Sequence, residues 1–330
     1  MTIHLISVGI SLVDNLRGGQ RLRGADGALA MTIVREKPWE ILGTEPAFVS
    51  NWLTGALAAE GSSERDPDRA RLLAEKTDRI QPHRWPARVS AELDTFDRDP
   101  TAKLPLSQDD VAVLVSSDTA PGLAAGLWNA VVLVDGDLGR VRYLSDPAAP
   151  IDAARGQALL VRVPGLDAGD QRGFCEAMRA LGSLGHSLRY GVAHPDEAFR
   201  CYLSGGFKAA IPYLIGLAEG LRSLADTGPV DAIVLHELTE SGPIKLPLRR
   251  MAPGLVKQEL AGFGADGVRR QAAKNSFLEG YAYGKYSEFP SAGLSRSSVL
   301  GSAGVRRGQH DGPVGGHRQV GHPGGHRRRG

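Results

Sequence analysis

The sequence predicts an α/β fold with a doubly wound, mainly parallel sheet, followed by a small C-terminal α+β region and a disordered tail. Two observations carry this prediction. Short apolar runs recur along the first 250 residues, and several are apolar on both faces, as in parallel strands covered by helices. Helical stretches separate these runs, and strands that alternate with helices form βαβ units.

The predicted strands are apolar runs that end in small polar residues. They span residues 3–9, 110–118, 158–165, 200–206 and 231–238. Helices are expected at residues 121–131, 169–188 and 208–224, with interrupted helical pieces between 51 and 76. After the last of these strands, residues 239–250 predict a turn and a short edge strand.

Two segments follow neither pattern. Residues 17–42 are rich in glycine and fit no single element. Residues 80–109 contain four prolines, which interrupt both helices and strands. We therefore expect residues 80–109 to be an excursion over the surface.

The chain divides into three parts by composition. Residues 1–250 form the predicted sheet domain, and residues 251–294 predict one or two helices and a β-hairpin, or part of a winged helix. Residues 295–330 are rich in glycine, arginine and histidine and carry almost no aliphatic side chains. The overall charge of +2 divides into +6 for residues 296–330 and −4 for the rest. Such a tail buries too little apolar surface to offset its ordering entropy, so we expect disorder.

The tail admits three interpretations. Its arginines suit a nucleic-acid-binding arm, and its histidines suit a metal-binding tract. The third is translation of a GC-rich gene in a wrong frame, because the composition changes abruptly after residue 294. No function is inferred from the tail.

The expected setting is a reduced cytoplasm. No apolar run is long enough to cross a bilayer, and the N-terminal "MTIHLISVGI" is typical of a first strand rather than a signal peptide. The two cysteines, Cys175 and Cys201, have no metal-ligand or redox spacing.

Polar side chains and glycines collect at the ends of three predicted strands. In a parallel sheet, ligands bind at these carboxyl ends, and a following helix N-terminus favours an anion. The residues expected to bind a ligand are Ser7, Gly9, Ser11 and Asn15 in the first loop, Ser116, Ser117 and Thr119 in the second, and Ser204, Gly205, Gly206, Phe207 and Lys208 in the third.

Structural roles compete with binding for several of these residues. Ser and Thr at such turns commonly cap helices, and paired glycines permit tight turns. Asp118 is expected to cap the helix near Pro121, because a carboxylate would repel an anionic ligand. Lys208 is different, since a cation in a first helical turn opposes the helix dipole unless an anion faces it.

Standard nucleotide and metal motifs are absent. The chain has neither GxxxxGK[ST] nor a GxGxxG fingerprint after its first strand. His236 and Glu237 lie at a strand end without a second histidine at metal-ligand spacing. We therefore predict no cofactor and no metal site.

The motifs "ISVGISLVDN", "VLVSSDTAPGLAAGLW", "YLSGGFKAAIPYL" and "DAIVLHELTESGPIKLPL" together resemble the CARF proteins, the CRISPR-associated Rossmann-fold sensors of type III antiviral defence. The resemblance covers about residues 2–248, and the Gly-Gly-Phe-Lys turn at 205–208 is its most specific part. It implies a Rossmann-like homodimer that binds a cyclic oligoadenylate of four or six units across its two-fold axis. A two-fold symmetric ring suits such an isologous dimer.

Some CARF proteins are also ring nucleases, in which a ribose 2′-OH attacks the adjacent phosphate without a metal. The resemblance then implies that Ser11 orients the ribose and that Lys208 stabilises the charge that develops on the phosphate. Binding and cleavage draw on the same residues, so the sequence leaves sensing and degradation both open.

The chain departs from the family after residue 251, where it shows no RxxxxH ribonuclease motif and no acidic metal-binding cluster. A stand-alone sensor or ring nuclease is the favoured interpretation. The alternative is a ligand-responsive transcriptional regulator that binds DNA through a winged helix in residues 251–294, and only this alternative involves nucleic acid. A third hypothesis is an unrelated Rossmann enzyme that uses a dinucleotide.

Overall fold

The computed structural model describes residues 1–18, 35–151, 153–166, 169–194, 196–206, 208–224, 228–235 and 242–252. The predicted C-terminal α+β region and tail lie outside these ranges, apart from Met251 and Ala252. Phe207, His236 and Glu237 also lie outside them.

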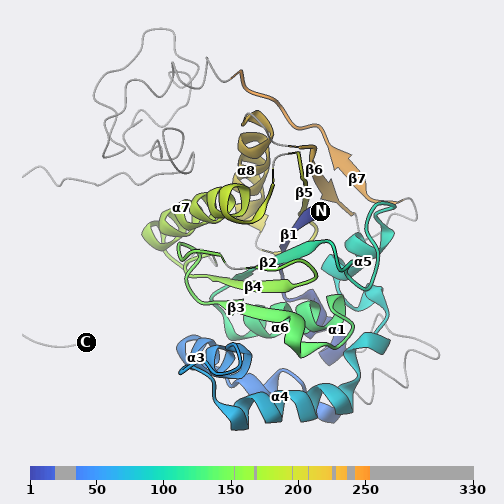
Figure 1. The fold of residues 1–330 in the computed structure, drawn as a ribbon, viewed down its shortest axis with the longest axis vertical. Helices are drawn as coiled ribbons and strands as arrows, with labels where there is room; N and C mark the ends of the chain where they lie inside the picture. The colour runs from blue at the N-terminus through green and yellow to red at the C-terminus, as the bar shows by residue number, and fades with distance from the viewer. Residues whose placement is uncertain are drawn as a thin grey trace, which may run out of the picture.

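A seven-stranded sheet with the order β3-β4-β2-β1-β5-β6-β7 forms the centre of the described fold (Figure 1). All neighbouring strands are parallel except β6 and β7, which are antiparallel. The strands are β1 (Thr2–Ser7), β2 (Val111–Ser117), β3 (Val141–Leu144), β4 (Ala158–Val163), β5 (Ala198–Tyr202), β6 (Val230–Val234) and β7 (Ile244–Leu246). The predicted α/β class and mainly parallel, Rossmann-like sheet are confirmed.

The five predicted strands match β1, β2, β4, β5 and β6, and the predicted edge strand matches β7. The sequence prediction missed β3, whose residues Val-Arg-Tyr-Leu are partly exposed after the first. β3 lies at the edge of the sheet and pairs only with β4. A strand covered on fewer sides needs fewer apolar residues, so it leaves a weaker pattern.

Helices cover both faces of the sheet, as a doubly wound fold requires (Figure 1). α7 (Gln171–Ser187) and α8 (Ile211–Ser223) contribute to one hydrophobic core, which includes Leu181, Leu214 and Val161 of β4. The other core receives side chains from α1 (Ser11–Gly18), α3 (Pro46–Leu57), α4 (Pro67–Ile80), α5 (Ala91–Arg98) and α6 (Ala120–Leu133).

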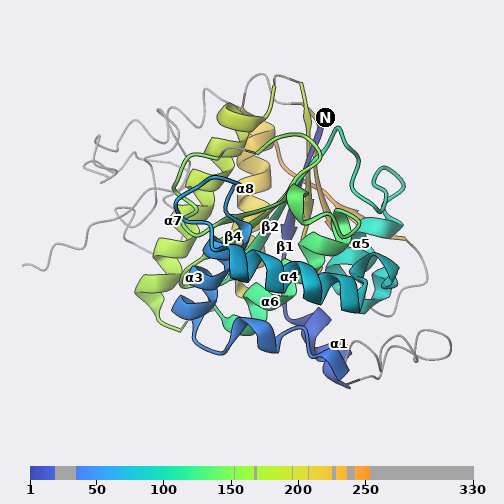
Figure 2. The ribbon, with the colours of Figure 1, turned by 60° about the horizontal axis from the view of Figure 1, so that its bottom comes forward.

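α6 is apolar almost all round because it lies between two layers. It packs on β2 and β4 on one side and contacts α3 on the other, and α3 in turn packs on α4 (Figure 2). Every residue of α6 except Pro121 is buried. A helix covered on both sides needs no polar face.

Residues 80–109 do not form the expected surface excursion, and that prediction was wrong. The segment contains two 3₁₀ turns, Pro82–Arg84 and Ala87–Val89, followed by α5. Trp85, Val89 and Phe96 are at most 5% exposed and belong to the core beneath the sheet. The prolines divide the segment into short pieces without moving it to the surface.

The strand order reverses at β1. The chain runs from β1 outward to β2, β3 and β4 on one side, then crosses through α7 to β5 on the other side of β1. In open α/β sheets the ligand crevice lies at the carboxyl ends of the strands where the order reverses. The topology therefore predicts a ligand site at the loops after β1 and β5.

Candidate functional site

The loops after β1 and β5 touch each other at their glycines. A Cβ atom built on Gly9 would lie 2.7 Å from the backbone nitrogen of Gly206, closer than real Cβ atoms approach. Gly206 has a φ of 91° and packs over the Ser7 hydroxyl. Both glycines are thus required by the close approach of the two loops, which brings the first and third predicted loops together.

A buried carboxylate lies at the mouth of α1. Glu92 Oε1 accepts a hydrogen bond from the backbone N–H of Gly9 at 2.5 Å. Its Oε2 accepts from the hydroxyls of Ser11 at 2.9 Å and Ser90 at 2.6 Å. Glu92 is only 2% exposed. The position that the sequence assigned to an anionic ligand beside Gly9 is therefore occupied by an anion from the chain itself.

The local sequence of α5 explains how Glu92 arrives there. Ser90 caps α5 by accepting from the backbone N–H of Leu93, and Glu92 stands in the first helical turn. Gly205 leaves room for the acid, since a Cβ at Gly205 would overlap the Glu92 side chain. Sequence reasoning missed Glu92, because a serine followed by an acid marks a helix start without indicating what the acid contacts.

Ser11 is partly exposed near these glycines, as is Asn15 one turn further along α1. Its hydroxyl donates to Glu92 and accepts from the backbone N–H of Ala91 at 3.1 Å. Ser7 is 5% exposed, and its hydroxyl donates to the carbonyl of Gly205 at 2.8 Å. The Asn15 amide donates to the carbonyl of Val89 at 3.0 Å. Ser7 and Asn15 therefore hold the site together in this structure.

The third loop presents Lys208 to solvent. Lys208 begins a 3₁₀ turn, Lys208–Ala210, that leads into α8. Its side chain is exposed, and it has no hydrogen bond or ion pair with any other residue that the structure describes. Ser204 is partly exposed and accepts from the backbone N–H of Leu235 at 2.7 Å.

The second loop is held by its own side chains. Thr119 caps α6 by accepting from the backbone N–H of Gly122 at 3.2 Å, and its hydroxyl lies 3.0 Å from that of Ser117. Ser116 is fully buried and donates to the carbonyl of Ser117 at 3.2 Å. Of these three, Ser117 and Thr119 are partly exposed at the carboxyl end of β2.

Asp118 does not cap α6, and that prediction was wrong. Its carboxylate instead pairs with Arg162 of β4 at 2.6 Å. The hydrogen bond that Arg162 donates to Asp118 raises the pKa of Arg162 above its usual value, against the effect of burial. Arg162 is a second cation at this edge of the sheet. Sequence analysis did not single out Arg162, because it lies within the apolar strand β4.

A buried polar cluster links α5 to the strands beneath the site. Tyr202 OH donates to Asp99 Oδ2 at 2.8 Å and lies 3.2 Å from His4 Nδ1, while Arg200 pairs with Asp99 at 3.2 Å. Burial opposes ionisation of Asp99, but hydrogen bonds from Thr101 and Tyr202, together with the charge of Arg200, lower its pKa below the usual value. Burial and the adjacent Asp99 raise the pKa of Tyr202 far above its usual range. This cluster fixes the end of α5, and therefore the helix that carries Glu92.

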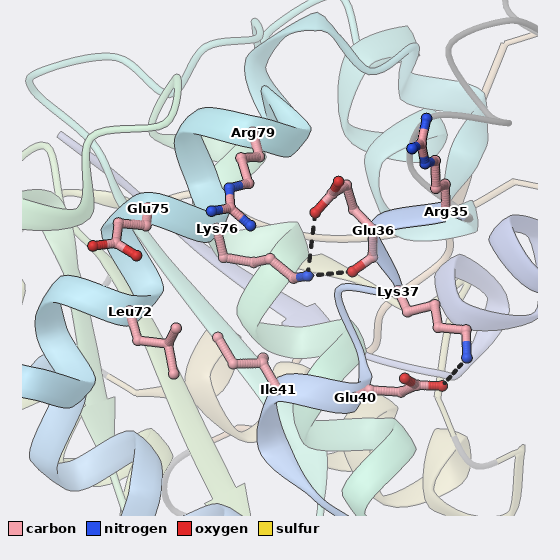
Figure 3. Close-up of a pocket in the computed structure, with 9 residues that line it drawn as sticks. All are labelled: Arg35, Glu36, Lys37, Glu40, Ile41, Leu72, Glu75, Lys76 and Arg79. Carbon is pink, nitrogen blue, oxygen red and sulfur yellow. Dashed lines mark hydrogen bonds and ion pairs between the residues drawn. The ribbon is translucent and has the colours of Figure 1, made fainter.

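A surface hollow of about 370 Å³ lies elsewhere, between α4 and the segment that precedes the 3₁₀ turn Glu40–Leu42 (Figure 3). Lys76 reaches across it to the carbonyl and carboxylate of Glu36, and Lys37 pairs with Glu40 at 2.9 Å. Figure 3 shows these acids and bases facing one another. The hollow includes no residue from the loops after β1, β2 or β5.

No group of three or more His, Cys, Asp or Glu side chains suited to a metal ion occurs within the described ranges. Cys201 is fully buried, and burial followed by the charge of Asp231 raises the pKa of its thiol to about 12. A thiol held in its protonated form is a poor nucleophile.

None of the helices in the described part of the chain is both long and apolar enough to span a membrane. No protein-family model matches the chain, and no curated protein matches its sequence.

Proposed function

We propose that this protein is a CARF-like homodimer that binds a cyclic oligoadenylate at the carboxyl ends of β1, β2 and β5 and cleaves the ring by 2′-OH attack. One observation carries the proposal. Lys208 is exposed, and it lacks a partner among the described residues, beside the point where the strand order reverses. A cation placed there without an internal partner suits an anionic ligand.

The buried charge of Glu92 restricts how a phosphate can approach. Like charges repel strongly where water is excluded, so a phosphate beside Gly9 would be unfavourable. The proposal therefore assigns the phosphate to Lys208 and a ribose hydroxyl to Ser11. The partly exposed hydroxyls of Ser117, Thr119 and Ser204 supply further polar groups around the same edge.

The proposed reaction is an internal transesterification. The ribose 2′-oxygen forms a bond to the adjacent phosphorus, the bond from phosphorus to the 5′-oxygen breaks, and the 2′ proton is transferred to the departing 5′-oxygen. The product is a linear chain that ends in a 2′,3′-cyclic phosphate. Ser11 orients the attacking hydroxyl, and Lys208 stabilises the charge that develops on the phosphoryl oxygens.

The test is incubation of the full chain with radiolabelled cyclic tetra-adenylate and hexa-adenylate in the presence of EDTA. Filter retention measures binding, and chromatography identifies products. We expect one ring to be retained and converted into linear species with 2′,3′-cyclic phosphate ends. Tight retention without products would make the protein a sensor, and failure to bind either ring would reject the proposed ligand.

A further inference from the structure

We propose that Glu92 fixes the direction of the Ser11 hydrogen bonds, so that Ser11 can only accept a hydrogen bond from a ligand and thereby selects a ribose 2′-hydroxyl. This inference rests on the proposed function and adds a specificity-determining residue to the site. Glu92 acts through Ser11 and is a positioning residue.

The argument begins with the capacity of a hydroxyl, which has one donor and two acceptor positions. The backbone N–H of Ala91 can only donate, so it fills one acceptor position of Ser11. Glu92 lies on the other side, where the Ser11 hydroxyl is 2.9 Å from Oε2. A carboxylate only accepts, so the single Ser11 proton is directed to Glu92. One acceptor position of Ser11 remains.

The surroundings of Glu92 keep it in the accepting role. Oε1 faces the N–H of Gly9, and Oε2 faces two serine hydroxyls. The Ser90 hydroxyl accepts from the N–H of Leu93 and donates its single proton to Oε2, because a carboxylate can only accept. Three donors therefore converge on this carboxylate.

Exposure determines which of these groups a ligand meets. Glu92 is 2% exposed, whereas Ser11 is partly exposed. A ligand therefore contacts Ser11 and not the acid behind it. The group that fits the remaining position of Ser11 is a hydrogen-bond donor such as a ribose 2′-hydroxyl. A 2′-fluorine would place its own lone pairs against the free lone pair of Ser11, which is unfavourable. A 2′-hydrogen would leave that lone pair without a hydrogen bond.

The first experiment compares rings that carry 2′-hydroxyl, 2′-hydrogen or 2′-fluorine groups, using the unsubstituted full chain and calorimetry in the cold with EDTA. We expect the hydroxyl ring to bind about threefold to tenfold more tightly than the 2′-hydrogen ring, as one net hydrogen bond predicts. The fluorine ring should bind no better than the hydrogen ring. Ser11→Ala should remove this order.

Glu92→Gln tests the role of the acid directly. The amide oxygen should stay on the Gly9 N–H, which places the NH₂ group where Oε2 faced Ser11 and Ser90. That NH₂ donates, so the Ser11 proton would turn toward the ligand. We expect the preference for the hydroxyl ring over the fluorine ring to narrow, because both groups can accept the Ser11 proton. Thr95→Ala, which removes a bond within α5 to the carbonyl of Ala91, should lower stability without changing the order.

The outcomes separate the two proposals. If the unsubstituted protein binds no ring, the proposed function fails and this inference fails with it. If it binds rings but prefers 2′-fluorine, or if Glu92→Gln folds and keeps the full original preference for the hydroxyl ring over the fluorine ring, only the role of Glu92 is overturned. The ring series on the unsubstituted protein decides the direction of the hydrogen bond even if Glu92→Gln does not fold.

Discussion

Single residues at the edge of the sheet differ in their internal hydrogen bonds and in their exposure to solvent. Ser7, Asn15 and Ser116 have the residue types expected of ligand contacts, but their polar groups are bonded to nearby backbone carbonyls. Ser11 is also bonded, to Glu92 and Ala91, but keeps one acceptor position and is partly exposed, and Lys208 is exposed. Residue type could be read from the sequence, whereas availability depends on neighbours far along the chain.

Lys208→Ala should abolish ring cleavage and weaken binding, because the exposed cation that faces the phosphate is lost. We expect the cleavage rate to fall by at least about a hundredfold, the usual loss when one charge-stabilising group is removed. Ser11→Ala should slow cleavage with a smaller change in affinity. Lys245→Ala, which removes a lysine of β7 that pairs with Asp231 of β6, is the matched control and should behave like the unsubstituted protein. Single-turnover kinetics measure ring binding and ring cleavage separately. Normal turnover by Lys208→Ala would refute the site assignment.

Gly206→Ala should destabilise the protein by about 1–3 kcal/mol, because an alanine at a φ of 91° is strained and its Cβ would overlap the Ser7 hydroxyl. Gly216→Ala in α8 is the control, since nothing lies near its Cβ position. That change should stabilise α8 by up to about 1 kcal/mol. Urea unfolding compares the two variants, and equal effects would contradict this account of the turn.

At the scale of elements, α5 is the one that the sequence interpretation placed wrongly. Its segment is rich in proline and charge, which is typical of loops. Yet α5 is held at both ends by polar contacts, through Glu92 to the loop after β1 and through Asp99 to β5. Buried acids that serve as anchors leave the same local pattern as exposed acids. The burial of α5 therefore could not be predicted from composition.

The anchor at Asp99 makes stability depend on acid pH. Because its pKa in the folded protein lies below the unfolded value of 3.8, Asp99 contributes stability above that value. The contribution is lost as the pH falls through the folded pKa. Asp99→Asn should reduce the fall of the unfolding free energy at acid pH, measured by urea unfolding over a pH series. Tyr202→Phe removes one of the hydrogen bonds to Asp99 and should reduce this acid-dependent fall in part. If the pH dependence is unchanged in both variants, the assignment to Asp99 is refuted.

At the scale of the whole molecule, the reversal of strand order at β1 brings the loops after β1 and β5 together at one edge of the sheet. The helices on opposite faces belong to separate hydrophobic cores, so the loops after β1 and β5 are supported from both sides. The strands and the helices on both faces therefore hold the ends of the two loops in place. The loops can lie in contact without needing further internal structure of their own.

The proposed homodimer predicts one ring for every two chains, with the two Lys208 side chains sharing the phosphates of one two-fold symmetric ligand. Sedimentation equilibrium measures the mass of the particle, and calorimetric titration measures the stoichiometry. We expect the mass of two chains and a ratio of one half. A ratio of one ring per chain, or a monomer that binds the ring fully, would contradict the shared site.

The sequence by itself determined the fold class, six of the seven strands and the edge of the sheet where polar residues gather. It did so because apolar runs, their alternation with helices and the turn residues are local properties of the chain. Only the tertiary structure decided what fills the mouth of α1. Ser11 and Glu92 are 81 positions apart, and no local pattern marks their contact. The packing of a distant helix placed a carboxylate where the sequence alone suggested a place for a ligand.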